Sequence, residues 1–212
     1  MKAVIFDMDG VLFDTEMVCQ LAWDAIGEEM GVGKAGYMVL KTLGVKAEMA
    51  IKMLKEEFGN DFDAESFKLR SRNYSYEYFD KYGVPAKDGL FEILPYLKNK
   101  GYKVALASST SSNSVYHHLK EKDIEKYFDA VICGDMIEKS KPEPDIYLKA
   151  CEAIGENPKN CYAVEDSKNG ILSASRAGCK VIMVPDLWMG DENTDKLLFA
   201  KCKNLFEIMD IL

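Results

Sequence analysis

The sequence lacks the features that mark structural zinc sites, export and membrane insertion. It contains two histidines, His117 and His118, which are adjacent, and its six cysteines form no Cys-x-x-Cys pair. Because structural zinc sites use ligand pairs at short fixed spacings, we expect no such site, and we expect the cysteines to be buried, reduced thiols. The apolar run over residues 2–6 is too short for a signal peptide or a membrane span. We therefore expect a cytoplasmic protein that has no membrane partner.

A basic surface is also missing. The chain has 27 basic and 35 acidic side chains, which give a formal net charge of −8 at pH 7. Nucleic-acid binding needs a basic footprint, so we exclude nucleic acid as a partner. An anionic small molecule stays possible, because a bound cation or a few lysines can reverse the field inside one cleft. The hydrophobic share of 48% is ordinary for a globular protein of 212 residues with a sizeable core.

The sequence does contain five short apolar runs that are typical of buried parallel strands. They cover residues 2–6, 102–107, 129–133, 160–164 and 180–184, and each is followed by polar residues. Helical patterns lie between them, over 90–99, 144–154 and 169–177. This alternation predicts an α/β fold with a doubly wound parallel sheet. In such sheets, ligands bind at the carboxyl ends of the strands, where the polar residues lie.

Residues 15–82 interrupt this alternation with helical patterns alone. We expect helices over 16–30, 46–58 and 63–80, and we find no convincing strand in this stretch. An ordinary crossover needs only about one helix and short loops. We therefore predict an inserted all-helical cap domain over 15–82, and a catalytic core made of 1–14 and 83–212. Because the insert begins just after the first strand, we expect it to act as a lid over the carboxyl edge of the sheet.

Acidic residues follow the first and fourth apolar runs. Asp7 and Asp9 are spaced i, i+2, and Glu165 and Asp166 are adjacent. Carboxylates this close repel one another unless a cation lies between them, and Mg²⁺ prefers such oxygen ligands. The chemistry assigns Asp7 the role of nucleophile toward phosphorus, and Asp9 the role of general acid and then base. The structural alternatives are an aspartate-rich turn for the first pair and a helix N-cap for Asp166.

Candidate phosphate ligands follow the second run and precede a later helix. Ser108 and Ser109 are followed by Thr110, and their hydroxyls with nearby backbone N–H groups suit a phosphate oxygen. Lys141 precedes a proline and a helical pattern, and it could neutralise both a phosphate and the aspartates. Each residue type is common in caps or on solvated surfaces. Together with the acidic pairs, however, the four motifs indicate one site for phosphoryl transfer.

These motifs resemble those of the haloacid-dehalogenase superfamily, and within it the beta-phosphoglucomutase-like phosphatases. The matching segments are Asp7–Glu16, Ala107–Ser108, Ser140–Tyr147 and Val164–Ser167. The resemblance implies a Rossmann-like core with a helical cap, and an attack of Asp7 on the phosphoryl group while Asp9 protonates the leaving oxygen. It also implies that Mg²⁺ is held by the Asp7 side chain, the Asp9 carbonyl and Asp166, with help from Glu165. Ser108 and Lys141 would hold the phosphate, and Ser109 is an adjacent candidate.

Two departures favour a phosphatase over a phosphosugar mutase, which is the alternative. The mutases carry a histidine where this chain has Cys19, and Gly-Val-Ser-Arg where it has Gly-Val-Lys-Ala over residues 44–47. The superfamily's dehalogenases lack the second aspartate, which is present here as Asp9. In a phospho-accepting receiver domain the acidic pair would follow the first strand and not the fourth. We expect a monomer or weak dimer that hydrolyses a small phosphorylated metabolite. The substrate class we expect is a sugar phosphate.

Overall fold

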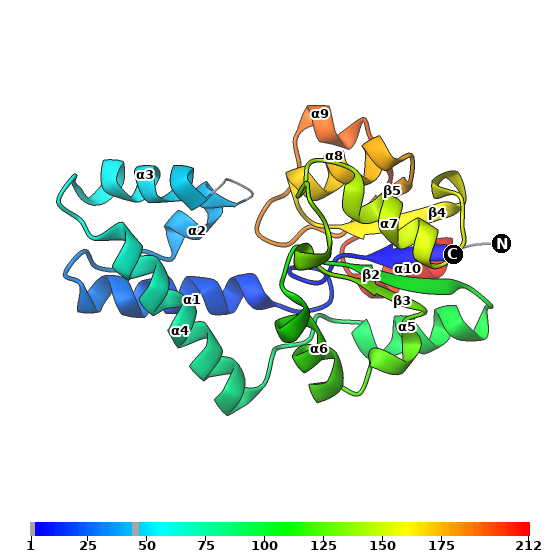
Figure 1. Cartoon of the computed structure of the whole chain (residues 1–212), viewed down its shortest axis with the longest axis horizontal. Helices are drawn as coiled ribbons and strands as arrows, with labels where there is room; N and C mark the ends of the chain where they lie inside the picture. Colours follow the sequence, from blue (N-terminus) through cyan, green and yellow to red (C-terminus); the bar gives the residue numbers. More distant parts are fainter. Residues whose placement is uncertain (1–2, 44–46) are drawn as a thin grey trace. The chain divides into compact units, whose positions relative to one another are not determined.

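The computed structural model describes residues 3–43 and 47–212, in two compact units (Figure 1). The first unit contains the chain up to Phe13 and from Ala86 onwards, and the second contains Asp14–Pro85. The boundaries predicted from the sequence, after residues 14 and 82, differ from these by one and three residues. The role of the second unit as a lid stays a prediction.

The first unit is built on a parallel sheet of six strands, in the order β3-β2-β1-β4-β5-β6. The strands are β1 (Ala3–Phe6), β2 (Lys103–Ala107), β3 (Ala130–Ile132), β4 (Cys161–Glu165), β5 (Lys180–Met183) and β6 (Leu198–Lys201). The predicted α/β fold is therefore confirmed, and the five predicted strands are present with ends shifted by at most one residue; residue 2 lies outside the described residues. β6 was not predicted, because this short edge strand leaves Phe199 52% exposed.

Helices cover both faces of this sheet. The α-helices of the unit are α5 (Leu90–Asn99), α6 (Ser112–Glu121), α7 (Asp145–Ala153), α8 (Lys168–Ala177), α9 (Glu192–Asp195) and α10 (Leu205–Ile211), and the short 3₁₀ turns are η1 (Glu125–Tyr127), η2 (Gly134–Met136) and η3 (Pro158–Asn160). Figure 1 shows α7 and α8 on one side of the sheet and α5 on the other. The three helical patterns predicted for this unit correspond to α5, α7 and α8.

The core under α7 combines small strand residues with larger helix residues. Ala105 and Ala107 of β2 face Ile146 and Tyr147 of α7, and all four are fully buried. Burial of one large apolar side chain contributes about 1.5–3 kcal/mol to stability. The short alanine side chains leave room for the first turn of α7, which brings Tyr147 toward the carboxyl ends of the strands.

The second unit is entirely helical in its described residues. It contains α1 (Thr15–Glu29), α2 (Tyr37–Thr42), α3 (Ala47–Phe58) and α4 (Ala64–Tyr82). The three predicted helices are present as α1, α3 and α4, although residue 46 lies outside the described residues. The six-residue α2 was not predicted, since only Met38 and Val39 of it are buried.

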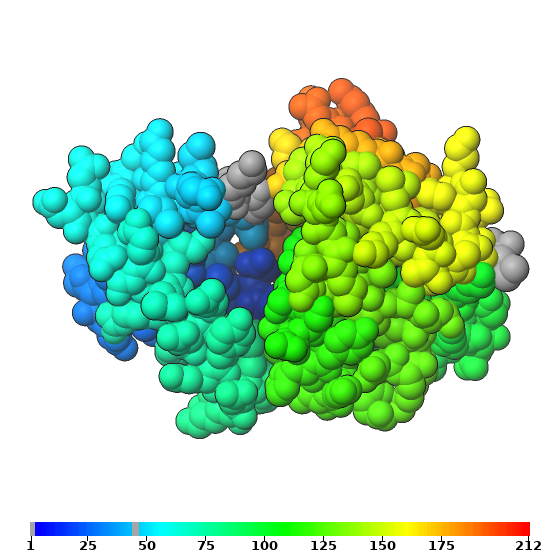
Figure 2. All heavy atoms as spheres, viewed as in Figure 1, coloured from blue at the N-terminus to red at the C-terminus, as the bar shows by residue number. Residues whose placement is uncertain are grey.

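Aromatic residues form the centre of the helical unit. The Trp23 and Phe67 rings lie 5.2 Å apart in an edge-to-face arrangement, and Phe62 lies 5.5 Å from Phe67. Asp63 caps α4 by accepting a hydrogen bond from the backbone N–H of Ser66 at 2.9 Å. Much of α3 and α4 is solvent-exposed, as their cyan and turquoise side chains show (Figure 2).

The expectations about the cysteines and about membrane insertion can be compared with the fold. None of the cysteines forms a disulfide, and all of them except the partly exposed Cys19 are buried. Within residues 3–43 and 47–212, no helix has the length and apolar character needed to cross a membrane.

Candidate active site

Most of the predicted site residues lie at the carboxyl ends of β1, β2 and β4, and Lys141 lies in the segment between η2 and α7. The backbone N–H of Asp7 donates to the Val164 carbonyl at 3.0 Å, and that of Ser108 donates to the Ile132 carbonyl at 3.0 Å. The ladder hydrogen bonds thus continue one residue beyond β1 and β2. They fix the backbone from which the Asp7 and Ser108 side chains project.

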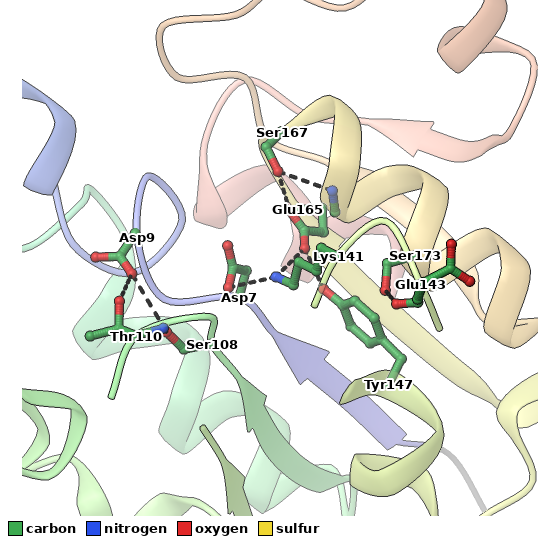
Figure 3. Close-up of polar contacts among 11 residues, drawn as sticks. Asp7, Asp9, Ser108, Thr110, Lys141, Glu143, Tyr147, Glu165, Ser167 and Ser173 are labelled. Carbon is green, nitrogen blue, oxygen red and sulfur yellow. Dashed lines mark hydrogen bonds and ion pairs between the residues drawn. The ribbon is translucent and has the colours of Figure 1, made fainter. Parts of the chain in front are cut away.

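Lys141 lies between two buried carboxylates (Figure 3). Its Nζ is 2.8 Å from Oδ1 of Asp7 and 2.6 Å from Oε1 of Glu165. The Lys141 side chain is only 7% exposed, so water screens this group weakly. Burial acts to lower the pKa of Lys141, but the charges of Asp7 and Glu165 outweigh it and raise the pKa overall. Lys141 is therefore a fixed positive charge beside the predicted nucleophile.

Asp7 has an unusual environment for an aspartate. Burial raises its pKa from 3.8 to about 7; Lys141 opposes this rise, and the negative charges of Glu165 and Asp9 add to it. The main cause is burial away from water, and the local crowding of negative charge adds to it. An arriving cation would relieve this crowding.

Glu165 is fully buried and is held by three side chains. Tyr147, which is also fully buried, donates from its hydroxyl to Oε1 of Glu165 at 2.6 Å, and Ser167 donates to Oε2 at 3.3 Å. Burial and the charge of Glu165 raise the pKa of Tyr147 well above its usual value, so its hydroxyl remains a donor. A side chain at Gly170 would collide with the Glu165 carboxylate, which explains the glycine there. We did not predict Tyr147 as a site residue, although it lies inside the matching segment Ser140–Tyr147.

A group of carboxylates fits a divalent cation with oxygen ligands. Asp7, Glu165 and Asp166 are all buried, and one ligand oxygen from each lies within 4.8 Å of the others. Lys141 supplies a single positive charge to this group, which leaves an excess of negative charge in a buried place. Burying unpaired charge is costly, so the donor set matches a site for Mg²⁺.

The turn after Asp9 depends on glycine. Gly10 has a φ of 75°, and a Cβ atom there would meet the carboxylate of Asp166. The turn is closed by hydrogen bonds from the N–H groups of Leu12 and Phe13 to the Met8 carbonyl, at 2.9 and 3.1 Å. Gly10 thus combines the left-handed backbone with the close approach of Asp166.

The Asp9 side chain lies toward the second strand. Its Oδ2 accepts a hydrogen bond from the Thr110 hydroxyl at 2.7 Å and lies 3.5 Å from the Ser108 hydroxyl (Figure 3). Ser108 is fully buried, and its Oγ accepts from the backbone N–H of Thr110 at 3.0 Å. Ser109 is exposed, so Thr110 is the neighbour that contacts Asp9. The phosphate-binding role of Ser109 stays a prediction.

A further pair of charged residues adjoins the carboxylates. Lys87 Nζ lies 2.7 Å from Oδ1 of Asp186, whose side chain is only 9% exposed. The other oxygen, Oδ2, is buried without a hydrogen-bond partner among the described residues, and it lies 3.3 Å from the position that a Cβ of Gly10 would take. Asp186 and Asp166 therefore approach the same turn. Asp186 lies three residues after the end of β5, on the side of the sheet where ligands bind in such folds.

Comparisons with known proteins identify the family of this chain. The model of the haloacid dehalogenase-like hydrolase family matches residues 4–184. A Thermotoga maritima protein named phosphorylated carbohydrates phosphatase is 35% identical over 182 residues, which are 86% of this chain and 84% of that protein. The beta-phosphoglucomutase of Bacillus subtilis is 30% identical over 184 residues, which are 84% of this chain and 80% of that protein.

Solved structures have the same fold. A Thermotoga maritima protein named as a candidate beta-phosphoglucomutase superposes with a TM-score of 0.81 and 31% identity, and covers 100% of this chain and 98% of its own. A family match over residues 4–184, together with a relative of 35% identity, is decisive for the family. The chain belongs to the haloacid dehalogenase-like hydrolases.

Proposed function

We propose that this protein is a magnesium-dependent phosphatase that acts through a covalent aspartyl-phosphate on Asp7. The proposed substrate is a small phosphorylated metabolite of the sugar-phosphate class. The observation that carries the proposal is the buried Asp7 carboxylate with Lys141 at 2.8 Å and two further carboxylates close by. The relative named phosphorylated carbohydrates phosphatase supports a sugar phosphate as the substrate class.

Each residue of the site has a role in the proposed reaction. A carboxylate oxygen of Asp7 bonds to phosphorus as the bond to the leaving oxygen breaks, and Asp9 gives that oxygen its proton. Water then attacks the same phosphorus and gives a proton back to Asp9, which releases phosphate and restores Asp7. The Thr110 hydroxyl, 2.7 Å from Asp9, orients the carboxyl group between these transfers. Lys141 and Ser108 bind the phosphoryl oxygens.

The residues that would hold Mg²⁺ are the side chains of Asp7 and Asp166, the backbone carbonyl of Asp9 and, in support, Glu165. When bound, the ion neutralises negative charge and orients the phosphoryl group. Because Oε1 of Glu165 already receives Lys141 and Tyr147, at 2.6 Å each, Glu165 also fixes the lysine that binds phosphate. Asp166 is buried beside Asp7 and Glu165, and we assign it as the second side-chain ligand.

The runner-up is a phosphosugar mutase, favoured by the 30% identical relative named beta-phosphoglucomutase. A mutase has to retain a bisphosphate intermediate, which calls for cap groups that bind a second phosphate. The guanidinium that would bind such a phosphate in a bidentate manner is replaced by Ala47 here, at the start of α3. Residues 44–46, including Lys46 at the serine position of that motif, lie outside the described residues. Water is therefore expected to win the competition for the aspartyl-phosphate.

The test is phosphate release from a panel of sugar phosphates and nucleotides in the presence of Mg²⁺. We expect repeated turnover by the wild type, none by Asp7→Asn, and wild-type rates for the control Asp210→Asn, which alters an exposed residue of α10. A parallel reaction supplies beta-glucose 1-phosphate with a trace of the 1,6-bisphosphate. Rapid formation of glucose 6-phosphate without phosphate release would identify a mutase. Full activity of Asp7→Asn would refute the aspartyl-phosphate mechanism.

A further inference from the structure

The last turn of α6 gathers metal-binding side chains away from the carboxylate group. His117, His118 and Glu121 each offer a ligand atom, and these atoms lie within 4.8 Å of one another. On a helix of 3.6 residues per turn, Glu121 points about 40° from His117 and about 60° from His118, one turn further along. The Glu121 carboxylate thus lies one turn after the two imidazoles and between them around the helix axis.

The separations within this group are compatible with ligands of a single ion. His118 Nδ1 and Glu121 Oε2 are 4.0 Å apart, and the two imidazole rings have centroids 5.5 Å apart. Two ligands that each bond to one zinc ion at about 2.0–2.1 Å are separated by roughly 3–4 Å. The other oxygen of Glu121 lies 2.7 Å from Lys122 Nζ, which turns Oε2 toward His118.

The protein surroundings suit a bound cation. His118 is only 5% exposed, and its ring packs edge-on against Phe13 at 5.9 Å, so little freedom is lost when it binds an ion. The carboxyl end of α6 also carries the negative pole of the helix dipole.

We propose that His117, His118 and Glu121 form a binding site for a transition-metal ion of the Zn²⁺ or Ni²⁺ class. Two imidazoles and one carboxylate favour such ions, whereas Mg²⁺ favours the oxygen-only group around Asp166. The two sites are therefore chemically distinct, and this proposal does not depend on the phosphatase function. Counting histidines and cysteines in the sequence misses the site, because Glu121 supplies the third ligand.

Phe13 gives this site a physical link to the catalytic loop. The ring of Phe13 contacts His118, and the carbonyl of Phe13 accepts a hydrogen bond from the N–H of Gly10 at 2.9 Å. Phe13 therefore connects an ion bound by His118 to the turn that carries Asp9.

The experiment titrates Zn²⁺ into the full-length, chelator-stripped protein by calorimetry, with reduced thiols and millimolar Mg²⁺ to occupy the carboxylate site. We expect the wild type to bind one Zn²⁺ that is lost or weakened at least tenfold in His117→Ala and in Glu121→Gln. Lys120→Ala, which alters an exposed neighbour on the same helix, is expected to bind like the wild type. All variants keep the six cysteines, so zinc bound by thiols is the same in each.

Three results would overturn the proposal. They are the absence of zinc binding by the wild type, unchanged affinity in His117→Ala, and an equal loss of affinity in Lys120→Ala. Because His117 is exposed, its replacement is expected to leave the fold intact, and the melting temperature of each variant without Zn²⁺ checks this.

Discussion

The hydroxyl of Tyr147 donates to the same oxygen of Glu165 that contacts Lys141. Both distances are 2.6 Å, and the Lys141 Nζ lies 5.3 Å from the centre of the Tyr147 ring. Tyr147 therefore holds the carboxylate that in turn holds the lysine beside Asp7. A tyrosine of this kind acts on the reaction through the position of Lys141.

Replacement of Tyr147 by phenylalanine tests this role with almost no change of shape. Loss of one hydrogen bond to a buried charged acceptor costs about 1–3 kcal/mol. If the lost hydrogen bond displaces Lys141, we expect kcat/KM for phosphate release to fall about tenfold. This decrease corresponds to about 1.4 kcal/mol. The measurement is steady-state kinetics, with Tyr162→Phe on β4 as the matched control. Wild-type kinetics in Tyr147→Phe would mean that Glu165 positions Lys141 unaided.

Magnesium is expected to stabilise the folded protein. Repulsion among Asp7, Glu165 and Asp166, which are all buried, is relieved by a divalent cation that binds only the folded state. The melting temperature of the wild type should therefore rise with Mg²⁺ and return after chelation. Asp166→Ala removes one of the repelling charges, so it should melt higher than the wild type without metal and lose the response to Mg²⁺. An undiminished Mg²⁺ response in Asp166→Ala would count against the site.

Asp186 is expected to support the same ion without joining the three closest carboxylates. Its buried Oδ2 approaches the Gly10 turn from the side of Asp166, while Lys87 holds Oδ1 at 2.7 Å. Groups of this kind orient metal-bound water or ligands, and their loss typically weakens metal affinity about 10- to 100-fold.

The isosteric variant Asp186→Asn tests this expectation by thermal melting over a range of Mg²⁺ concentrations. The concentration needed for half of the full stabilisation should rise about tenfold. Asp210→Asn, on the exposed side of α10, is the control and should keep the wild-type midpoint. An identical midpoint in Asp186→Asn would restrict the function of Asp186 to its ion pair with Lys87.

Much of the fold and the site could be predicted because local patterns carry them. Buried parallel strands are continuous apolar runs, and the acidic pairs follow β1 and β4 directly, so the sequence places Asp7 and Asp166 at one edge of the sheet. The short elements α2 and β6 were missed because few residues of α2 and none of β6 are buried. Their formation depends on packing that a local pattern does not contain.

The supporting residues were missed for a different reason. Tyr147 has the spacing of a core residue of α7, and it is one, so no pattern distinguishes its hydroxyl contact with Glu165 from ordinary packing. Asp186 follows a strand like the predicted ligands, yet its relation to Gly10 joins residues 176 positions apart. Such contacts are properties of the folded chain and not of its local sequence.

The last prediction concerns the pH dependence of stability at Asp129, which directly precedes β3 at the amino ends of the strands. The carboxylate of Asp129 accepts hydrogen bonds from the backbone N–H of Val104 at 2.8 Å and from Lys98 Nζ at 2.7 Å. Burial acts to raise the pKa of Asp129, but the bonds from Lys98 and Val104 outweigh it, so the pKa is lowered from 3.8. A lowered carboxyl pKa contributes stability that is present above the unfolded value and is lost as the pH falls through the folded value.

Asp129→Asn keeps the shape of this side chain but removes its charge. Because the Asp129 side chain is 38% exposed, water screens the ion pair, and we expect a loss of about 1 kcal/mol at pH 7. The measurement is the denaturation midpoint of both proteins from pH 7 down to pH 3, with Asp210→Asn as the control. The gap between wild type and Asp129→Asn should be constant above pH 5 and narrow below pH 4, as the wild-type carboxylate becomes protonated. A gap that stays the same at every pH would mean that the charge of Asp129 adds nothing beyond a neutral hydrogen bond.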